Sequence, residues 1–360
     1  MKAIIAAGGR GTRMRPITHT MNKHLIPLAN RPMLEYPIQK LKEAGIVDIA
    51  INVNPGEMDL MQSFFGDGSR FGVNLTYIEQ QGGAMGIAHA VANAEPFLHG
   101  SKFVFFLGDN IMVGSLRKMR ERFDSENINC MIALARVKDP QRFGVPEFDD
   151  QNNLIATIEK PTNPPSPFAI TGIYFFDEQY FDAFKTITPS ARGEYEITDM
   201  INWYLKNGKV GYHEITGWWK DTGTADALLQ GNALLLDEML RGQEYIPCKL
   251  HDQTQIHGNV YIGQDTKIGA NVLIRGPVVI GKNCELDNCY IGPYTSIGDG
   301  TKINNTELEY SIVMSDANIQ AKRRIINAII GSHVVITSSD DSLPISGHRL
   351  VIGDNSVVEL

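Results

Sequence analysis

Near its start the chain reads KAIIAAGGRGTRMRP over residues 2–16, and this stretch decides the class of fold. The apolar run at residues 2–6 predicts a β-strand, and the glycines that follow it predict a tight loop. Glycines directly after the first strand of an α/β sheet let the backbone approach a ligand, and the N–H groups they expose can bind phosphate. The spacing is neither GxGxxG nor GxxxxGK[ST], so the loop is neither a dinucleotide fingerprint nor a P-loop.

Up to about residue 240, short β-rich runs alternate with helical patterns. This alternation predicts an α/β domain with a mostly parallel sheet and helices on both faces, and ligands in such sheets bind beyond the carboxyl ends of the strands. Further strands at 145–148, 154–159 and 169–176 predict an antiparallel extension over the cleft. Strands are otherwise predicted at residues 2–6, 48–53, 73–78, 103–107 and 130–135, and helices at 32–44, 58–65, 87–94, 116–123, 198–206 and 225–240.

From residue 256 the hydrophobic pattern has a period of six. Branched residues recur at Ile256, Ile262, Ile268, Ile274, Ile280 and Leu286 and, after a five-residue step, at Ile291 and Ile297. A glycine follows most of these isoleucines. A β-branched residue inside and a small residue at each corner are typical of a parallel β-helix. The period weakens over 307–326 and returns at 330–336, so about four to five coils of roughly 18 residues are expected.

Composition and charge exclude several classes of protein. The chain has 360 residues, of which 43% are apolar and 21% charged, so it is a folded protein, and its length favours two domains. A net charge of −8 argues against a surface for polymeric nucleic acid or for an acidic membrane. Four cysteines without a CxxC pair favour a reduced cytoplasmic location, and no apolar run is long enough to span a membrane.

Basic residues are concentrated at the start of this acidic chain. Residues 1–34 contain no acidic residue and six basic ones, namely Lys2, Arg10, Arg13, Arg15, Lys23 and Arg31. Behind a glycine-rich turn, this asymmetry indicates a bound polyanion. The alternative is a solvated basic turn.

Two aspartates end apolar or aromatic segments of the first half. Asp109 follows the strand at 103–107, and Asp221 follows Trp218-Trp219-Lys220 just before the helix at 225–240. Carboxylates at the mouth of the cleft could hold Mg²⁺ beside phosphate groups. The alternatives are a turn for Asp109 and a helix cap for Asp221.

Three further charged residues are candidates for contacts to a sugar phosphate. Glu159 and Lys160 end the strand at 154–159, and Arg192 lies in the segment SARGE at 190–194. Lys160 and Arg192 could bind a phosphate group, and Glu159 could accept hydrogen bonds from sugar hydroxyls. A surface ion pair between Glu159 and Lys160 is the alternative.

Taken together, these segments resemble a known family. The motifs GGxGTRxRP at 8–16, LGDN at 107–110, EKP at 159–161, TGIY at 171–174, SARGE at 190–194 and WKDTG at 219–223 follow the order found in sugar-nucleotide pyrophosphorylases. The hexapeptide repeats and the ending GHRLVIGD at 347–354 resemble the long form of the glucose-1-phosphate thymidylyltransferases, so the resemblance covers nearly the whole chain.

The resemblance implies a Rossmann-like nucleotidyltransferase domain with a mixed, mostly parallel sheet, followed by a left-handed parallel β-helix. It places the catalytic domain at residues 1–240, a linker at 241–255, the β-helix at 256–338 and a tail at 339–360. A homo-oligomer assembled through the β-helix is expected.

The resemblance also implies a reaction. A nucleoside triphosphate, dTTP or UTP, and glucose 1-phosphate give NDP-glucose and pyrophosphate by in-line attack with Mg²⁺. By similarity, the nucleotide is bound by Gly8, Gly9, Gly11, Thr12, Arg13, Lys23, Gln80 or Gln81, Gly86 and Asp109. The metal is bound by Asp109 and Asp221. The sugar phosphate is bound by Gly144, Glu159, Lys160, Thr171, Arg192 and Trp219. Catalysis depends on Arg13, Lys23, Lys160 and Asp109.

The sequence departs from the family pattern at three places. His24 stands where the family often has Gln, Phe143 replaces a Tyr of the shorter forms, and one residue is inserted near the base-reading Gln, so that Gln80 and Gln81 both remain candidates. Two other functions stay open: acyl transfer on the β-helix, with His257 or His333 as base, and a non-catalytic regulatory subunit.

Overall fold

The computed structural model describes residues 1–242, 245–247 and 250–337. Two compact units divide the chain. The first unit comprises Met1–Gly9 and Leu34–Asp221, and the second comprises Arg10–Met33 together with the chain from Thr222 onward. This division does not follow the expected boundary at residue 240, because the basic segment and the last helix of the first half group with the β-helix. The expected tail at 339–360 lies outside the described residues.

A seven-stranded sheet forms the centre of the first unit, in the order β12-β8-β11-β6-β1-β4-β5. The adjacent strands β6, β1, β4 and β5 run parallel to one another, and β12 runs parallel to β8. The strands are β1 Lys2–Ala6, β4 Asp48–Val53, β5 Asn74–Glu79, β6 Phe103–Leu107, β8 Cys130–Arg136, β11 Phe168–Phe176 and β12 Val210–Glu214. The expected mixed, mostly parallel sheet is confirmed.

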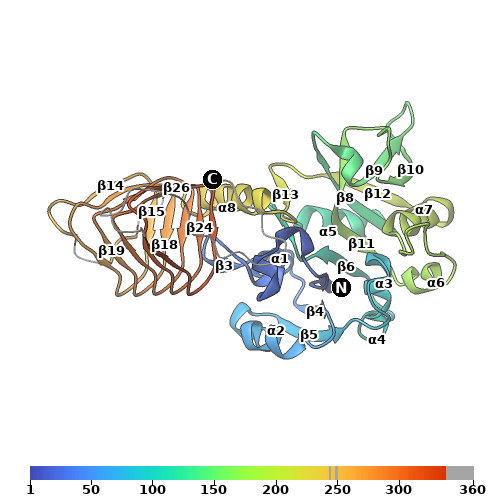
Figure 1. The fold of residues 1–360 in the computed structure, drawn as a ribbon. Coiled ribbons are helices and arrows are strands. Elements are labelled where there is room, and N and C mark those ends of the chain that lie inside the picture. Colours follow the sequence, from blue (N-terminus) through green and yellow to red (C-terminus); the bar gives the residue numbers. More distant parts are fainter. Residues whose placement is uncertain (243–244, 248–249, 338–360) are drawn as a thin grey trace. The chain divides into compact units, whose positions relative to one another are not determined.

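Strand β11 corrects one expectation. The sequence assigned residues 169–176 to an extension over the cleft, but β11 lies inside the sheet, antiparallel to both β6 and β8. Every residue of β11 after Phe168 is buried, which fits a central strand covered on both faces. Of the three strands expected in that extension, β9 (Gly144–Phe148) and β10 (Leu154–Glu159) do form a separate antiparallel pair, which Figure 1 shows near α7.

Helices cover both faces of this sheet (Figure 1). Helices α3 (Ile87–Ala92), α6 (Tyr180–Phe184) and α7 (Ile197–Asn207) share one hydrophobic core with Phe103 and Phe105 of β6. Helix α5 contacts the other face, where the rings of Phe123 and Phe175 lie 5.6 Å apart. The remaining helices of this unit are α1 Glu35–Glu43, α2 Met58–Phe65 and α4 Glu95–Leu98, and α5 spans Arg117–Ser125.

Two short strands that the sequence did not predict pair with each other. β7 (Asn110–Met112) and β13 (Trp219–Asp221) are antiparallel, with Asp221 opposite Asn110. Each has three residues, too few to show a periodic pattern. Their pairing joins segments that are far apart in the sequence. A side-chain bond adds to it, since Trp219 Nε1 donates to Asn110 Oδ1 at 2.7 Å across 109 residues of sequence.

The second unit begins with the basic segment. It contains the short 3₁₀ turns η1 (Thr12–Met14), η2 (Ile17–His19) and η3 (Lys23–Leu25), followed by a hairpin of β2 (Pro27–Leu28) and β3 (Arg31–Pro32). Pro32, which was predicted to start a helix, lies in this hairpin. Helix α8 (Ala225–Met239) packs beside β2 and begins after Thr224, whose side chain accepts from Ala227 N–H.

The β-helix of the second unit consists of three parallel sheets of five strands, visible as stacked rungs in Figure 1. One sheet contains β14 Gln255–His257, β17 Leu273–Arg275, β20 Tyr290–Ile291, β23 Glu307–Glu309 and β26 Arg324–Ile326. The next contains β15 Val260–Ile262, β18 Val278–Ile280, β21 Thr295–Ile297, β24 Ile312–Val313 and β27 Ile329–Ile330. The third contains β16 Lys267–Ile268, β19 Glu285–Asp287, β22 Lys302–Asn304, β25 Asn318–Gln320 and β28 Val335–Thr337.

Coil length explains why the sequence pattern weakened after residue 307. Ile256 and Ile274 are register partners 18 residues apart, whereas Ile274 and Ile291 are 17 apart and Ile297 and Val313 are 16 apart. Each shortening shifts the six-residue period, although the inward-facing residues still stack. The expected parallel β-helix is confirmed.

Two observations bear on location and redox state. Among the described residues, no helix is both long and apolar enough to cross a bilayer. Cys130, Cys284 and Cys289 are buried free thiols, and burial raises the pKa of the Cys289 thiol to about 12. Cys248 lies outside the described residues.

Candidate functional site

The glycine loop leaves the carboxyl end of β1, between β4 and β6. Ala7 N–H donates to Asn52 O at 2.8 Å, and Gly9 N–H donates to Asn54 Oδ1 at 2.8 Å. Gly9 has φ 99°, a conformation that favours glycine. The loop is therefore held by β4 at the edge where ligands of parallel sheets bind.

The cationic part of the motif belongs to the second unit. Gly11 O accepts from Thr18 Oγ1 at 2.8 Å, and Thr12 and Arg13 are exposed at the start of η1. Lys23 is half-buried in η3. The neighbouring His24 is buried, and its ring Nδ1 lies 3.0 Å from Asn22 Oδ1. The departure from the family at His24 therefore places a buried ring in the turn that carries Lys23.

The loop after β5 distinguishes the two candidate glutamines. Gln80 Oε1 lies 3.7 Å from the position that a Cβ on Gly8 would occupy, and Gln80 Nε2 donates to Gly83 O at 3.0 Å. Gln81 is exposed and its N–H donates to Asn93 Oδ1 at 2.7 Å. The position of Gln80 beside Gly8 favours it over Gln81 for the predicted base-reading role, which stays a prediction.

Gly86 ends the same loop in close contact with the segment that carries Arg192. Tyr195 N–H donates to Met85 O at 2.8 Å, and a Cβ on Gly86 would lie 2.6 Å from Tyr195 O. Gly86 also has φ 95°, so both space and backbone conformation require glycine there. The contact links the loop at 80–86, which follows β5, to the segment at 190–196.

The pairing of β7 with β13 brings the two predicted metal ligands together. Asp221 lies opposite Asn110, the residue after Asp109, and Asn110 Nδ2 donates to Asp109 Oδ1 at 2.9 Å. Asp221 is the last residue of β13, and Thr224 caps α8, so the cap interpretation of Asp221 is wrong. Asn110, which the sequence placed within a motif without giving it a role, holds Asp109 and Trp219 at once.

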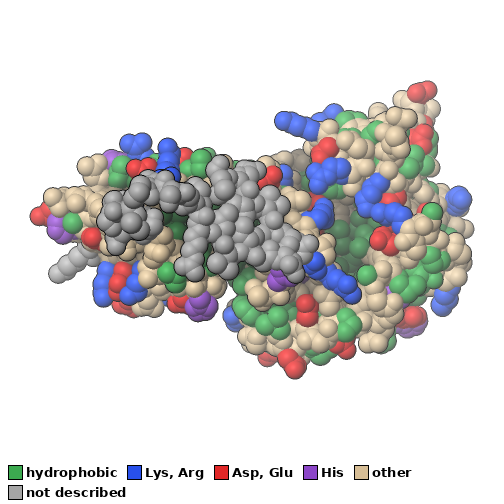
Figure 2. Space-filling view, in the orientation of Figure 1, with side chains coloured by type: hydrophobic (Ala, Val, Ile, Leu, Met, Phe, Trp, Pro, Cys, Tyr) green, Lys and Arg blue, Asp and Glu red, His purple; other side chains and the backbone are tan. Residues whose placement is uncertain are grey.

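Glu159, Lys160 and Arg192 form one charged cluster. Glu159 Oε1 lies 3.4 Å from Lys160 Nζ and 3.3 Å from an Arg192 Nη2 that also binds both carboxylate oxygens of Glu196 at 2.8 Å. Burial raises the pKa of the Glu159 carboxyl above its usual value, although Lys160 and Arg192 act in the opposite direction. Figure 2 shows Lys and Arg side chains grouped beside a hollow below the β9–β10 strands.

The cluster divides its positive charge unequally. Glu196, Glu194 and Glu159 all lie within ion-pair distance of Arg192, whereas Lys160 pairs with Glu159. Glu196 was not among the predicted site residues. Much of the Arg192 charge is thus compensated within the protein, and Lys160, whose side chain is 49% exposed, is better placed to meet an incoming phosphate.

The other predicted sugar-site residues differ in how close they lie to Glu159. Gly144 is its register partner in the β9–β10 pair, and a Cβ there would lie 3.4 Å from Glu159 Oε2. The Trp219 ring packs edge-on against Phe143 at 5.5 Å. Thr171 is fully buried and its hydroxyl donates to Ala133 O at 3.0 Å, so its side chain is occupied inside the sheet.

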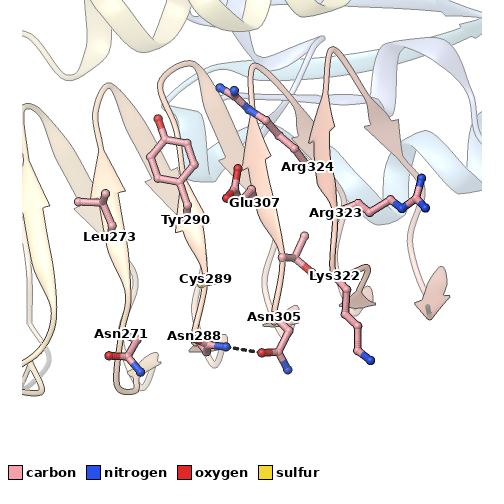
Figure 3. Close-up of a pocket in the computed structure, with 11 residues that line it drawn as sticks. Asn271, Leu273, Asn288, Cys289, Tyr290, Asn305, Glu307, Lys322, Arg323 and Arg324 are labelled. Carbon is pink, nitrogen blue, oxygen red and sulfur yellow. Dashed lines mark hydrogen bonds between the residues drawn. The ribbon is translucent and has the colours of Figure 1, made fainter. Parts of the chain in front are cut away.

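A separate groove lies on the β-helix (Figure 3). Its volume is about 590 Å³, and none of the predicted site residues is among those lining it. Corner asparagines, the basic run Lys322–Arg324 and Tyr290 surround it. Arg324 is paired with Glu309. His257 and His333, the candidate bases for acyl transfer, do not line this groove either.

Comparison with known proteins identifies the family of this chain. The nucleotidyl transferase family matches residues 2–238, and the bacterial transferase hexapeptide family matches residues 247–282. The chain is 39% identical to the low-salt glycan biosynthesis nucleotidyltransferase Agl11 of Haloferax volcanii over the full length of both. It is also 39% identical to the glucose-1-phosphate thymidylyltransferase of Streptomyces antibioticus, covering 100% of this chain and 99% of the relative.

A solved structure gives the same family. The Bacillus anthracis protein, assigned as a glucose-1-phosphate thymidylyltransferase and crystallised with sucrose, is 44% identical with a TM-score of 0.62. The match covers 65% of this chain and 94% of that one. Because the family match covers residues 2–238 and these relatives are 39% identical along the whole chain, the chain is an enzyme that belongs to the nucleotidyl transferase family.

Proposed function

We propose that the enzyme joins a nucleoside triphosphate, dTTP or UTP, to glucose 1-phosphate and releases pyrophosphate. The observation that carries the proposal is the β7–β13 register, which places Asp221 opposite Asn110, the residue after Asp109. A cluster suited to a sugar phosphate, Glu159–Lys160–Arg192, lies in the same unit. The relatives named glucose-1-phosphate thymidylyltransferase support this choice of substrates.

The carboxylate pair fits Mg²⁺. Oxygen ligands suit this hard cation, which commonly takes one or two protein carboxylates and keeps several waters. Asp109 and Asp221 would hold it, with Asn110 fixing Asp109 through its side-chain amide. When bound, the ion offsets repulsion between the phosphate groups of the two substrates.

The protein groups contribute position and charge. A phosphate oxygen of the sugar phosphate attacks the α-phosphorus of the nucleotide, and the bond from that phosphorus to the β-phosphate oxygen breaks. Lys160 would orient the attacking phosphate, and Arg13 and Lys23 would stabilise the charge that develops on the departing pyrophosphate. No covalent enzyme intermediate is needed.

The sugar would be bound beside Glu159. Its carboxylate can accept hydrogen bonds from hydroxyl groups, and Trp219 offers an apolar face. Arg192, which Glu196 holds in place, would orient Glu159 more than it binds phosphate. We expect glucose 1-phosphate to be preferred over N-acetylglucosamine 1-phosphate.

Pyrophosphate release, measured with four nucleoside triphosphates against several sugar 1-phosphates, tests the proposal. Turnover with dTTP or UTP and glucose 1-phosphate is expected. Equal kcat/KM for glucose 1-phosphate and its N-acetylglucosamine counterpart would contradict the sugar assignment, and no release with any pair would favour the regulatory alternative. An arm with acetyl-CoA examines acyl transfer.

A further inference from the structure

The turn that carries Lys23 continues directly into a tight hairpin. Met33 N–H donates to Ile26 O at 3.1 Å, and strands β2 and β3 are joined by the two residues Ala29 and Asn30, with φ of 45° and 61°. Positive φ at both positions is typical of a two-residue hairpin turn. The position of Lys23 therefore depends on where this hairpin is held.

Asn232, in the middle of α8, holds the turn of the hairpin. Its Oδ1 accepts from Ala29 N–H at 2.8 Å and from Ser296 Oγ at 3.0 Å, and its Nδ2 donates to Tyr294 O at 3.2 Å. Asn232 and Ser296 have no exposed surface. Ser296 lies in β21 and Tyr294 just before it, so one buried amide connects the hairpin, α8 and a coil of the β-helix.

A second bond joins the same hairpin to the same coil. Asn30 Nδ2 donates to Ile297 O, the last residue of β21, at 2.6 Å. Ala29 is buried and Asn30 is half-buried, so this contact is only partly exposed to water. The bonds of Asn232 to Ala29 and Ser296 are buried, and losing them leaves buried groups unpaired, which costs more than the bonds themselves contribute.

We propose that the β-helix positions the triphosphate-binding turn, with Asn232 as the positioning residue that couples them. The basic segment Arg10–Met33 belongs to the β-helix unit, and Asn232 and Asn30 fix its hairpin to β21. The β-helix then has a role in nucleotide binding besides any role in assembly. The inference rests on the proposed function only in assigning Lys23 and Arg13 to the triphosphate.

The first test is Asn232→Leu in the full-length protein, a change that keeps the branching and the number of side-chain heavy atoms and removes all three bonds. We expect the KM for the nucleoside triphosphate to rise about tenfold, which corresponds to about 1.4 kcal/mol, and the KM for glucose 1-phosphate to change less than about threefold. The matched control is Thr301→Val. Thr301 is also fully buried in the β-helix and donates to Met314 O at 3.2 Å, away from the hairpin.

The second test is Asn30→Gly, which keeps a residue suited to positive φ and removes only the bond to Ile297. It decides the question by itself if Asn232→Leu does not fold. A smaller rise in nucleotide KM is expected. Amide hydrogen exchange over residues 10–33 should be faster than in the wild type for both variants, and this readout needs no turnover.

The outcomes separate the two proposals. Unchanged nucleotide KM and unchanged exchange in the variants would overturn the positioning role, as would an equal rise in both KM values or the same effect from Thr301→Val. If the wild-type enzyme releases no pyrophosphate, the proposed function fails. Faster exchange over residues 10–33 would then still support the positioning role, and unchanged exchange would overturn it.

Discussion

Gly86→Ala tests the contact between the loop at 80–86 and the segment at 190–196, which carries Arg192. The new Cβ would lie 2.6 Å from Tyr195 O and 2.8 Å from Tyr195 N. The first distance is about 0.8 Å closer than the 3.4 Å at which ordinary van der Waals contact begins. Both neighbours are backbone atoms, which cannot rotate away. The loop must therefore move, and the bond from Tyr195 N–H to Met85 O must lengthen or break.

The expected cost has two parts. A non-glycine residue at φ 95° and ψ 165°, a region essentially restricted to glycine, costs about 1–3 kcal/mol, and overpacking adds about 1–3 kcal/mol. Gly83→Ala is the matched control, because Gly83 has φ 82° in the same loop and no atom within 4 Å of an added Cβ. The control carries only the conformational cost. Gly86→Ala should therefore lower the free energy of unfolding by about 1–3 kcal/mol more than Gly83→Ala.

Activity should separate the two variants further. A displacement of about 1 Å in a binding loop can reduce catalysis by roughly 10²-fold, so kcat/KM for the nucleotide should fall by about that factor in Gly86→Ala. Gly83→Ala should stay within about threefold of the wild type, since nothing has to move. Urea unfolding and pyrophosphate-release kinetics measure both quantities. Equal stability and equal kcat/KM in the two variants would refute the argument from the Tyr195 contact.

Three further predictions concern the charged residues. Asp109→Asn and Asp221→Asn should each reduce turnover by roughly 10²-fold, and the double variant should be little worse than either, because both residues hold one ion. Turnover titrated against Mg²⁺ checks this, and unchanged metal dependence in both variants would exclude a shared site. Lys160→Ala should lower kcat/KM for the sugar phosphate by roughly 30- to 1,000-fold. The control Lys185→Ala, which removes an exposed ion pair with Asp182, should leave kcat/KM unchanged, and a loss below about fivefold for Lys160→Ala would favour a plain surface ion pair. Because burial raises the pKa of Glu159, folding favours its neutral form, and the stability that this group contributes is greatest below the ordinary value of 4.5 and declines as pH rises through the raised pKa. Glu159→Gln lacks this decline, so in urea unfolding it should gain stability relative to the wild type as pH rises from about 4 to about 7, while losing activity. A stability difference that stays constant across that range would contradict the assignment.

Local patterns explain what the sequence could predict. The apolar strand at 103–107 and the repeats after residue 256 bury side chains at a fixed spacing, so their periodicity is visible in the chain itself. The place of β11 between β6 and β8 was missed because a buried run shows that a strand is central without showing which strands flank it. The carboxylate pair was predicted from a resemblance, whereas the register that joins it depends on two three-residue strands.

One feature of the sequence indicates that the β2–β3 hairpin is attached to α8. Leu228, Asn232 and Leu236 are four residues apart, so an asparagine lies in the buried stripe of an otherwise apolar helix. A buried amide needs partners for its acceptor and its donor, and α8 uses its own backbone groups in helical bonds. The partners must therefore come from other segments, here Ala29, Tyr294 and Ser296. The sequence thus indicates that α8 is tied to something polar, but only the structure identifies the segment, because the three partners lie 203, 62 and 64 residues away.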